Sequence, residues 1–187
     1  AGDHVLLMTT ADNVDKATAL LGLRKARIER IVIMGTTRLS ELTTEAMLEA
    51  GFSVVLIDKD RARCSLMSAR HPKALVVHGD PTDPEVLTEL ELGRRDAVLA
   101  LTGWDEVNIT VCLVAKALGA ASTIARFNQI AYVSLLSGHG IDAAVSSRLL
   151  AASAILRYVR HGSIHQVVTF SDTDAEAIEV EVAEGSP

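Results

Sequence analysis

Cysteine and aromatic residues are scarce in this chain of 187 residues, which has two cysteines and 3% aromatic residues. Basic residues are fewer than acidic ones, which gives a net charge of −6. The negative charge argues against a nucleic-acid partner. No apolar run reaches the ~20 residues that a membrane-spanning helix needs, and no signal peptide is visible. Cys64 and Cys112 both fall in predicted helices, where we expect buried free thiols, as suits a reducing cytoplasm.

Catalytic motifs are also missing from the sequence. Its six histidines show neither an HExxH pattern nor metal-ligand spacing, and the GxSxG and GxxxxGK[ST] motifs are absent. His78 lies at the end of a predicted strand, and we interpret it as a hydrogen-bonded structural residue. The sequence therefore predicts no catalytic residue and no metal site, and favours a protein that is not an enzyme.

The strongest positive pattern lies in residues 31–60. An apolar, β-branched run at residues 31–34 ends at Gly35, a segment with helical spacing then reaches Gly51, and a second apolar run at residues 53–57 ends at Asp58. Strand, glycine turn, helix, strand and terminal acid together predict the first βαβ unit of a dinucleotide-binding fold.

The helix of this unit has an apolar and a charged face. We expect one face to be buried and the other to carry the glutamates in solvent. The expected buried residues are Leu39, Leu42, Thr43, Ala46, Met47 and Ala50, and the expected exposed residues are Glu41, Glu45 and Glu49.

The α/β alternation continues after this unit. Further strands are predicted at residues 74–78, 96–101, 122–126 and 141–145, and helices at residues 61–70, 84–90, 106–118, 129–136 and 149–159. Strands and helices that alternate in this way predict an α/β fold with a Rossmann-like, doubly wound parallel sheet. The helix at residues 149–159 has more apolar positions than one face can bury against a sheet, which predicts an oligomer.

The two ends of the sequence do not continue this pattern. Near the start, an apolar run at residues 4–8 precedes a helix that reaches about residue 21, and near the end residues 167–170 and 177–182 predict a short hairpin. The first residue is Ala1 rather than methionine, so we expect a piece of a longer protein. The expected domains are the tail of a small domain (1–22), a linker (23–30), the Rossmann-like domain (31–162) and the start of another small domain (163–187).

Polar residues follow each central strand of the predicted sheet, at the edge where doubly wound sheets bind ligands. We expect Asp58 to bind ribose hydroxyls, Asp80 to lie near a base, and the Thr102 hydroxyl and Arg126 to contact phosphate. The alternative for each residue is a role in capping or in a turn. The full set of candidate cofactor-binding residues is Gly35, Thr36, Thr37, Asp58, Lys59, Gly79, Asp80, Thr102 and Arg126.

The glycine fingerprint of such sites is incomplete here. Where the motif has three glycines, this sequence has Gly35, Thr37 and Ser40. Ser40 is small enough to keep helix and strand close, but the branched side chain of Thr37 stands where the backbone should approach a pyrophosphate. Trp104 could be a packing residue or a lip of the pocket, and packing is the interpretation we favour.

Five short segments carry a family resemblance: residues 58–60 (DKD), 78–80 (HGD), 100–108 (ALTGWDEVN), 125–126 (AR) and 132–142 (YVSLLSGHGID). Over roughly residues 28–162 the sequence resembles the RCK or KTN domain (TrkA-N type), the nucleotide-binding regulatory domain of bacterial potassium transport systems. The resemblance implies NAD(H) or ATP/ADP as ligand and a homo-oligomer. It also implies a membrane potassium transporter subunit as partner, on the cytoplasmic, inner face of the plasma membrane, and TrkA-C type α+β fragments at both ends.

Three functions therefore remain in view. The preferred one is a regulatory domain that controls potassium uptake and responds to NAD(H) or an adenine nucleotide. The alternatives are a degenerate Rossmann domain that serves only as an assembly surface, and an NAD-dependent oxidoreductase. Titration with nucleotides separates the first two, and a turnover assay with hydride donors tests the third.

Overall fold

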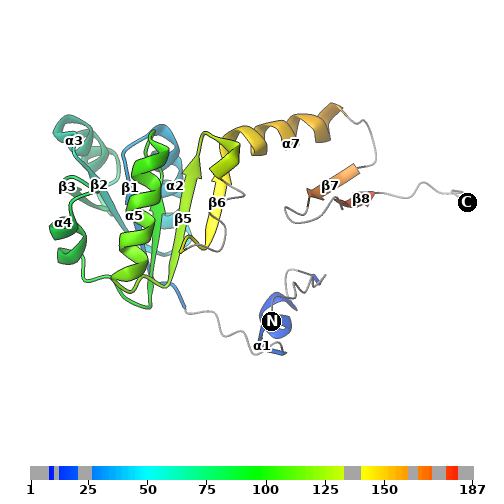
Figure 1. Ribbon diagram of the computed structural model, residues 1–187, viewed down its shortest axis with the longest axis horizontal. Helices are drawn as coiled ribbons and strands as arrows, with labels where there is room; N and C mark the ends of the chain where they lie inside the picture. The colour runs from blue at the N-terminus through cyan, green and yellow to red at the C-terminus, as the bar shows by residue number, and fades with distance from the viewer. Residues whose placement is uncertain are drawn as a thin grey trace, which may run out of the picture.

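The computed structural model describes residues 9–10, 13–20, 27–132, 140–159, 164–169 and 176–180. Its centre is a six-stranded, all-parallel sheet with the order β3-β2-β1-β4-β5-β6 (Figure 1). The strands are β1 (Arg30–Met34), β2 (Ser53–Asp58), β3 (Leu75–His78), β4 (Asp96–Ala100), β5 (Ser122–Phe127) and β6 (Ala143–Ser146). The helices around them are α2 (Arg38–Glu49), α3 (Arg61–Arg70), α4 (Pro84–Glu89), α5 (Asp105–Ala117) and α7 (Ser147–Val159).

This strand order is that of the doubly wound Rossmann fold, so the predicted fold class is confirmed. The predicted bounds shift only at element ends: β6 begins at Ala143 rather than residue 141, and α7 begins at Ser147 rather than residue 149. Most of the helix expected at residues 129–136 lies outside the described residues. Strand order reverses between β1 and β4, and this reversal creates the crevice in which such folds bind ligands.

Alternate residues of β1 enter two separate apolar cores. Val32 and Met34 pack on the face covered by α4 and α5, with Cys112 of α5 in the same core. Ile31 and Ile33 pack on the opposite face with residues of α2 and α3. In Figure 1, α5 lies in front of the sheet and α2 behind it. A strand that is buried on both faces explains the continuous apolar run in the sequence.

The buried face of α2 is the predicted one only in part, since Glu45 and Glu49 are exposed and Met47 packs against the core as expected. Ser40, Glu41 and Thr44 are the buried residues of this helix, whereas Leu42 is 46% exposed. Small Ser40 and Thr44 side chains let the helix approach the sheet closely, and the carboxylate of Glu41 is neutralised by two arginines described below. Helical spacing of apolar residues therefore predicted the helix correctly and its buried face only in part, because close packing of small side chains outweighed hydrophobicity near the start of the helix.

The described parts of the two ends carry further elements. Helix α1 (Val14–Leu20) precedes the sheet, and β7 (Ile164–Thr169) pairs antiparallel with β8 (Glu176–Val180). These two strands form a sheet of their own. The apolar run expected at residues 4–8 lies outside the described residues. Among the helices that the structure describes, none has the length and apolarity needed to cross a bilayer.

Both cysteines are buried and free, as predicted. Burial raises the pKa of the Cys112 thiol to about 12 and also raises that of Cys64. Because only the thiolate reacts with disulfide reagents, we expect both thiols to react at least ~100-fold more slowly in the folded protein than in denaturant. A thiol titration with a chromogenic disulfide at pH 8 measures this, and one thiol reacting at the denatured rate would contradict the buried placement.

Candidate functional site

A pocket of about 260 Å³ opens at the carboxyl edge of the sheet, over the reversal between β1 and β4. Its volume is just below the range of roughly 300–1,000 Å³ that is usual for small-molecule sites. The lining residues come from the ends of the central strands, the loops that follow them and the first turns of α3 and α5: Gly35, Thr37, Asp58, Lys59, Asp60, Arg63, Asp80, Pro81, Thr82, Thr102, Gly103, Trp104 and Val107.

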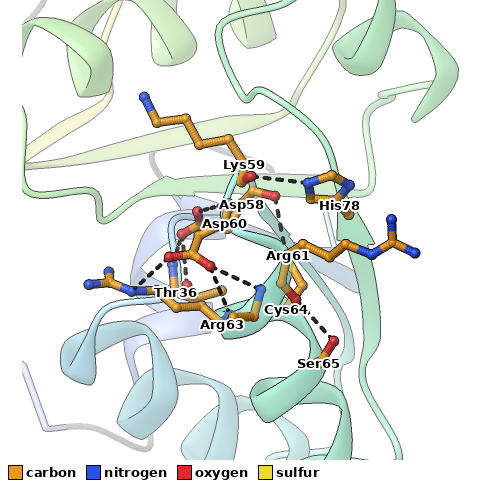
Figure 2. Close-up of polar contacts among 10 residues, drawn as sticks. Thr36, Asp58, Lys59, Asp60, Arg61, Arg63, Cys64, Ser65 and His78 are labelled. Carbon is orange, nitrogen blue, oxygen red and sulfur yellow. Dashed lines mark hydrogen bonds and ion pairs between the residues drawn. The ribbon is translucent and has the colours of Figure 1, made fainter.

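The carboxylate of Asp58 connects the end of β2 to the loop that follows β1 (Figure 2). Its Oδ2 accepts hydrogen bonds from the backbone N–H of Thr36 at 2.6 Å and from the Thr36 hydroxyl at 2.7 Å. Its Oδ1 accepts the N–H of Asp60 at 2.9 Å. Asp58 therefore shapes the glycine loop as well as facing the pocket, since each carboxylate oxygen can accept more than one hydrogen bond.

Thr37 is the N-cap residue of α2. Its Oγ1 accepts the N–H of Ser40 at 3.2 Å and donates to the carbonyl oxygen of Leu101 at 3.1 Å, while its own N–H donates to Ser40 Oγ at 3.2 Å. This reciprocal capping box explains why a hydroxyl residue stands at the second glycine position of the fingerprint. In a helix that begins at Arg38, the N–H groups of Arg38 and Leu39 have no intrahelical acceptor, and they remain suited to an anion.

Gly35 allows β1 and β4 to approach each other at the floor of the pocket. Its φ of +95° is in the region that favours glycine, and a Cβ at this position would lie 3.1 Å from the Cα of Thr102. A side chain here would therefore be strained by its backbone and crowded by β4. The first glycine of the fingerprint is retained for both reasons.

Asn108 holds the ends of β4 and β5 together from within α5. Its Oδ1 accepts the N–H and the hydroxyl of Thr102 at 3.0 and 2.7 Å, and its Nδ2 donates to the carbonyl oxygens of Thr102 and Arg126 at 3.2 and 2.8 Å. The side chain is fully buried. Asn108 thereby satisfies main-chain groups of both strand ends, as buried polar groups require.

Asp105, the first residue of α5, makes the corresponding connection to the turn after β5. Its carboxylate accepts the backbone N–H groups of Asn128 and Gln129 at 2.9 Å, and the side-chain amide of Asn128 at 3.0 Å. The threonine, aspartate and asparagine of the segment at residues 100–108 are therefore structural ties that fix the pocket wall.

Charged groups surround the mouth of the pocket. The hydroxyl and the N–H of Thr82 and the nearby charge of Lys59 lower the pKa of Asp80, so this carboxylate is ionised at neutral pH. Arg63 lies 3.5 Å from Asp60 in an exposed ion pair (Figure 2). His78 contacts the carbonyl oxygen of Lys59 at 3.0 Å, which confirms its interpretation as a hydrogen-bonded residue.

The structure brings six of the nine candidate residues into the pocket wall, and three lie outside it. The six are Gly35, Thr37, Asp58, Lys59, Asp80 and Thr102. Thr36 is buried against Asp58, and Gly79 packs against Val86. The guanidinium of Arg126 donates to the carbonyl oxygen of Thr102 at 3.2 Å and to Asn128 Oδ1 at 2.8 Å.

The packing interpretation of Trp104 is wrong. Its side chain is 70% exposed and lines the pocket, where a large aromatic ring forms one lip. Sequence reasoning also missed Arg63, which reaches the pocket from the first turn of α3. Its position three residues after the N-cap Asp60 was the available signal, because side chains in a first helical turn lie near the preceding strand end.

Strand order, a positive-φ glycine after β1, an acid at the end of β2 and a pocket at the reversal point define a Rossmann-like domain with a pocket where such folds bind ligands. The TrkA-N domain family is matched over residues 31–147. The chain belongs to the TrkA-N domain family.

Comparison with individual proteins agrees with this assignment. The chain is 32% identical over 188 residues to the Trk system potassium uptake protein TrkA of Azorhizobium caulinodans, covering all of this chain and 41% of that protein. The NAD(P)-binding domain of an exopolyphosphatase-related protein from Archaeoglobus fulgidus has the same fold, with a TM-score of 0.62 and 22% identity over 72% of this chain and 98% of that one. The GsuK channel, solved bound to NAD, has a TM-score of 0.60 at 20% identity over 78% of this chain and 26% of that one. This chain therefore spans less than half the length of its TrkA relative.

The Asn108 tie predicts a large stability effect. Asn108→Ala leaves the N–H of Thr102 and the carbonyl oxygen of Arg126 buried without partners, and we expect a loss of about 3 kcal/mol in the free energy of unfolding. Thr110→Ala is the matched control on the same helix. It removes an exposed hydroxyl bonded only to the carbonyl oxygen of Glu106, and should change stability by less than about 0.5 kcal/mol. Urea denaturation measures both, and equal effects would show that Asn108 is not a structural tie.

Proposed function

We propose that this chain is the nucleotide-binding part of a regulatory subunit that controls potassium uptake through a membrane transporter. The pocket at the strand reversal, with Asp58 at the end of β2 and the start of α2 beside it, carries the proposal. Family membership supports it, as does the naming of the A. caulinodans relative for potassium uptake. The division into a Rossmann-like domain at residues 31–162 between parts of small TrkA-C type domains belongs to the same proposal.

An adenine nucleotide with a free ribose 2′-hydroxyl is the proposed ligand. The pocket volume suits an adenosine moiety better than a whole dinucleotide. Asp58 would accept the ribose hydroxyls and repel a 2′-phosphate, and the first N–H groups of α2 would face the phosphates. The related fold of the GsuK channel has been solved bound to NAD and, at 22% identity and a TM-score of 0.56, bound to ADP, which supports either nucleotide.

Regulation rather than hydride transfer is the proposed use of this nucleotide. The pocket wall, as far as the structure describes it, contains no histidine, cysteine or tyrosine that would exchange a proton with a substrate. Gating requires only that the nucleotide bind two states of the assembly with different affinity. The proposed place of action is the cytoplasmic face of the membrane, beside the transporter.

Trp104 provides a direct assay for the pocket, because it is the only tryptophan of the chain and lies at the lip. We expect NADH to quench its fluorescence, and NADPH to bind at least ~10-fold more weakly because Asp58 repels the 2′-phosphate. Asp58→Asn keeps an oxygen for the N–H of Thr36 and should abolish most of this preference. Glu106→Gln, which removes an exposed charge of the first turn of α5 outside the pocket, is the matched control.

Two results would contradict the proposal. If neither NADH, ADP nor ATP changes the Trp104 signal while the protein is folded, the domain is an assembly surface only. The capping role of Thr37 is the structural observation that favours this second candidate. If NADH is consumed in a protein-dependent turnover with a carbonyl substrate, the oxidoreductase alternative replaces regulation.

Helix α7 supports the proposed homo-oligomer. Leu149, Leu150 and Ile155 are exposed on it, with Leu150 at 61%. Exposed apolar side chains on one helix favour burial against another copy. We expect a dimer at micromolar concentration in sedimentation velocity and a shift towards monomer in Leu150→Glu. The control is Leu66→Glu, an exposed leucine on α3, which should leave the distribution unchanged. A monomer in the unmodified protein would contradict this part of the proposal.

A further inference from the structure

Three side chains with metal-binding chemistry meet between α2 and the end of α3. They are Glu41 and Glu45 of α2 and His71, the residue that ends α3, and one ligand atom of each lies within 4.8 Å of the other two. Glu41 and Glu45 are four residues apart, so they lie on the same side of the helix. None of the three lines the nucleotide pocket.

His71 supplies an independent observation. The side chain is buried, with a residue exposure of 6%, and its Nε2 has no hydrogen-bond partner among the described residues. Buried polar side-chain atoms almost always have a partner, which can be protein, water or a bound ion. The Nε2 atom of His71 lacks such a partner in the described part of the chain and lies in a cluster with two carboxylates. This arrangement points to a bound ligand as its missing partner.

Glu41 is already ionised and anchored. Its carboxylate is 2.6 Å from Arg38 and 2.6 Å from Arg70, and the hydrogen bonds from these two guanidinium groups lower its pKa. Each oxygen keeps lone-pair capacity for a further partner. The side chains of Arg38 and Arg70 are 71% and 51% exposed, so either can turn into solvent when another cation takes its place.

We propose that Glu41, Glu45 and His71 bind a divalent transition-metal cation, of which Zn²⁺ fits best. Zinc takes imidazole nitrogen and carboxylate oxygen together, whereas Mg²⁺ and Ca²⁺ prefer oxygen ligands alone. Zinc needs donor atoms about 2 Å from the ion, so the three atoms must close up slightly. The exposed side chain of Glu45 provides this movement. Three protein ligands leave a fourth position for water.

The cation competes with an arginine for Glu41, which gives the site a distinctive response to mutation. Removing a ligand weakens binding, whereas removing Arg70 should strengthen it, because one positive charge no longer opposes the cation. A surface that attracts zinc through acidic residues alone has no requirement for His71. The competition and the histidine requirement together distinguish a built site from loose association.

Isothermal titration of chelator-treated protein with ZnCl₂ tests the proposal. We expect Glu45→Gln to weaken the zinc step at this site at least tenfold, and Glu49→Gln, an exposed glutamate one turn further along α2, to leave it unchanged. Arg70→Gln should tighten the same step, and Arg61→Gln on α3 should not. Zinc binding at other histidines contributes equally in all variants. The test is therefore the difference in zinc affinity between each variant and the unmodified protein.

The outcomes separate clearly. Equal zinc binding in the unmodified protein and Glu45→Gln, or unchanged affinity in Arg70→Gln, would overturn the proposal. Binding of Mg²⁺ as tight as that of Zn²⁺ would mean that the carboxylates act without His71, and would also overturn it. His71→Gln should abolish the step if circular dichroism shows a folded protein, and the Glu45 and Arg70 variants decide the question if it does not. The result is independent of nucleotide binding.

Discussion

The hydrogen bonds from the N–H and hydroxyl of Thr36 to the Asp58 carboxylate set the shape of the pocket at the carboxyl edge of the sheet. They fix the loop after β1 against the end of β2, so that Gly35 can pass close to Thr102 on the other side. On the far side of the pocket, Asn108 and Asp105 hold the ends of β4 and β5 in the same manner. Hydrogen bonds from side chains to the main chain at the strand ends therefore shape the pocket. These hydrogen bonds form within the protein and do not depend on a ligand.

This arrangement divides the candidate residues into two groups. Thr36, Thr37 and Arg126 are occupied by structural hydrogen bonds and do not offer a free charge to the pocket. Lys59 and Asp80 line the pocket with opposite charges, and the Asp80 carboxylate is held in place by Thr82. Such an edge is preorganised, because its donors and acceptors are held in place by other residues and need little rearrangement on binding. At position 37, where the fingerprint has a flexible glycine, the Thr37 hydroxyl caps α2 and fixes the first turn of the helix.

Much of the fold could be predicted from the sequence, because strands buried on both faces appear as continuous apolar runs and the βαβ unit has a recognisable order of strand, glycine, helix and acid. The buried face of α2 could be predicted only in part, since burial of Glu41 depends on Arg70, which lies on another helix. The candidate site could also be predicted only in part, because some of its residues are brought together by elements that are distant in the sequence. Residues directly after strands were found, but Trp104 was assigned to packing although it lies in the loop after β4, and Arg63 was missed because it enters the pocket from the first turn of α3. The cluster of Glu41 and His71 has no spacing in the sequence that would reveal it.

Helix α7 follows β6 without an intervening loop, since β6 ends at Ser146 and α7 begins at Ser147 (Figure 1). The helix is therefore attached directly to the last strand of the sheet, and a change in the direction of β6 would turn α7 with it. Because its 13 residues span about 20 Å, a tilt of about 5° at the strand end displaces the far end of the helix by about 2 Å. A small rotation at the end of β6 would therefore be enlarged at the far end of α7.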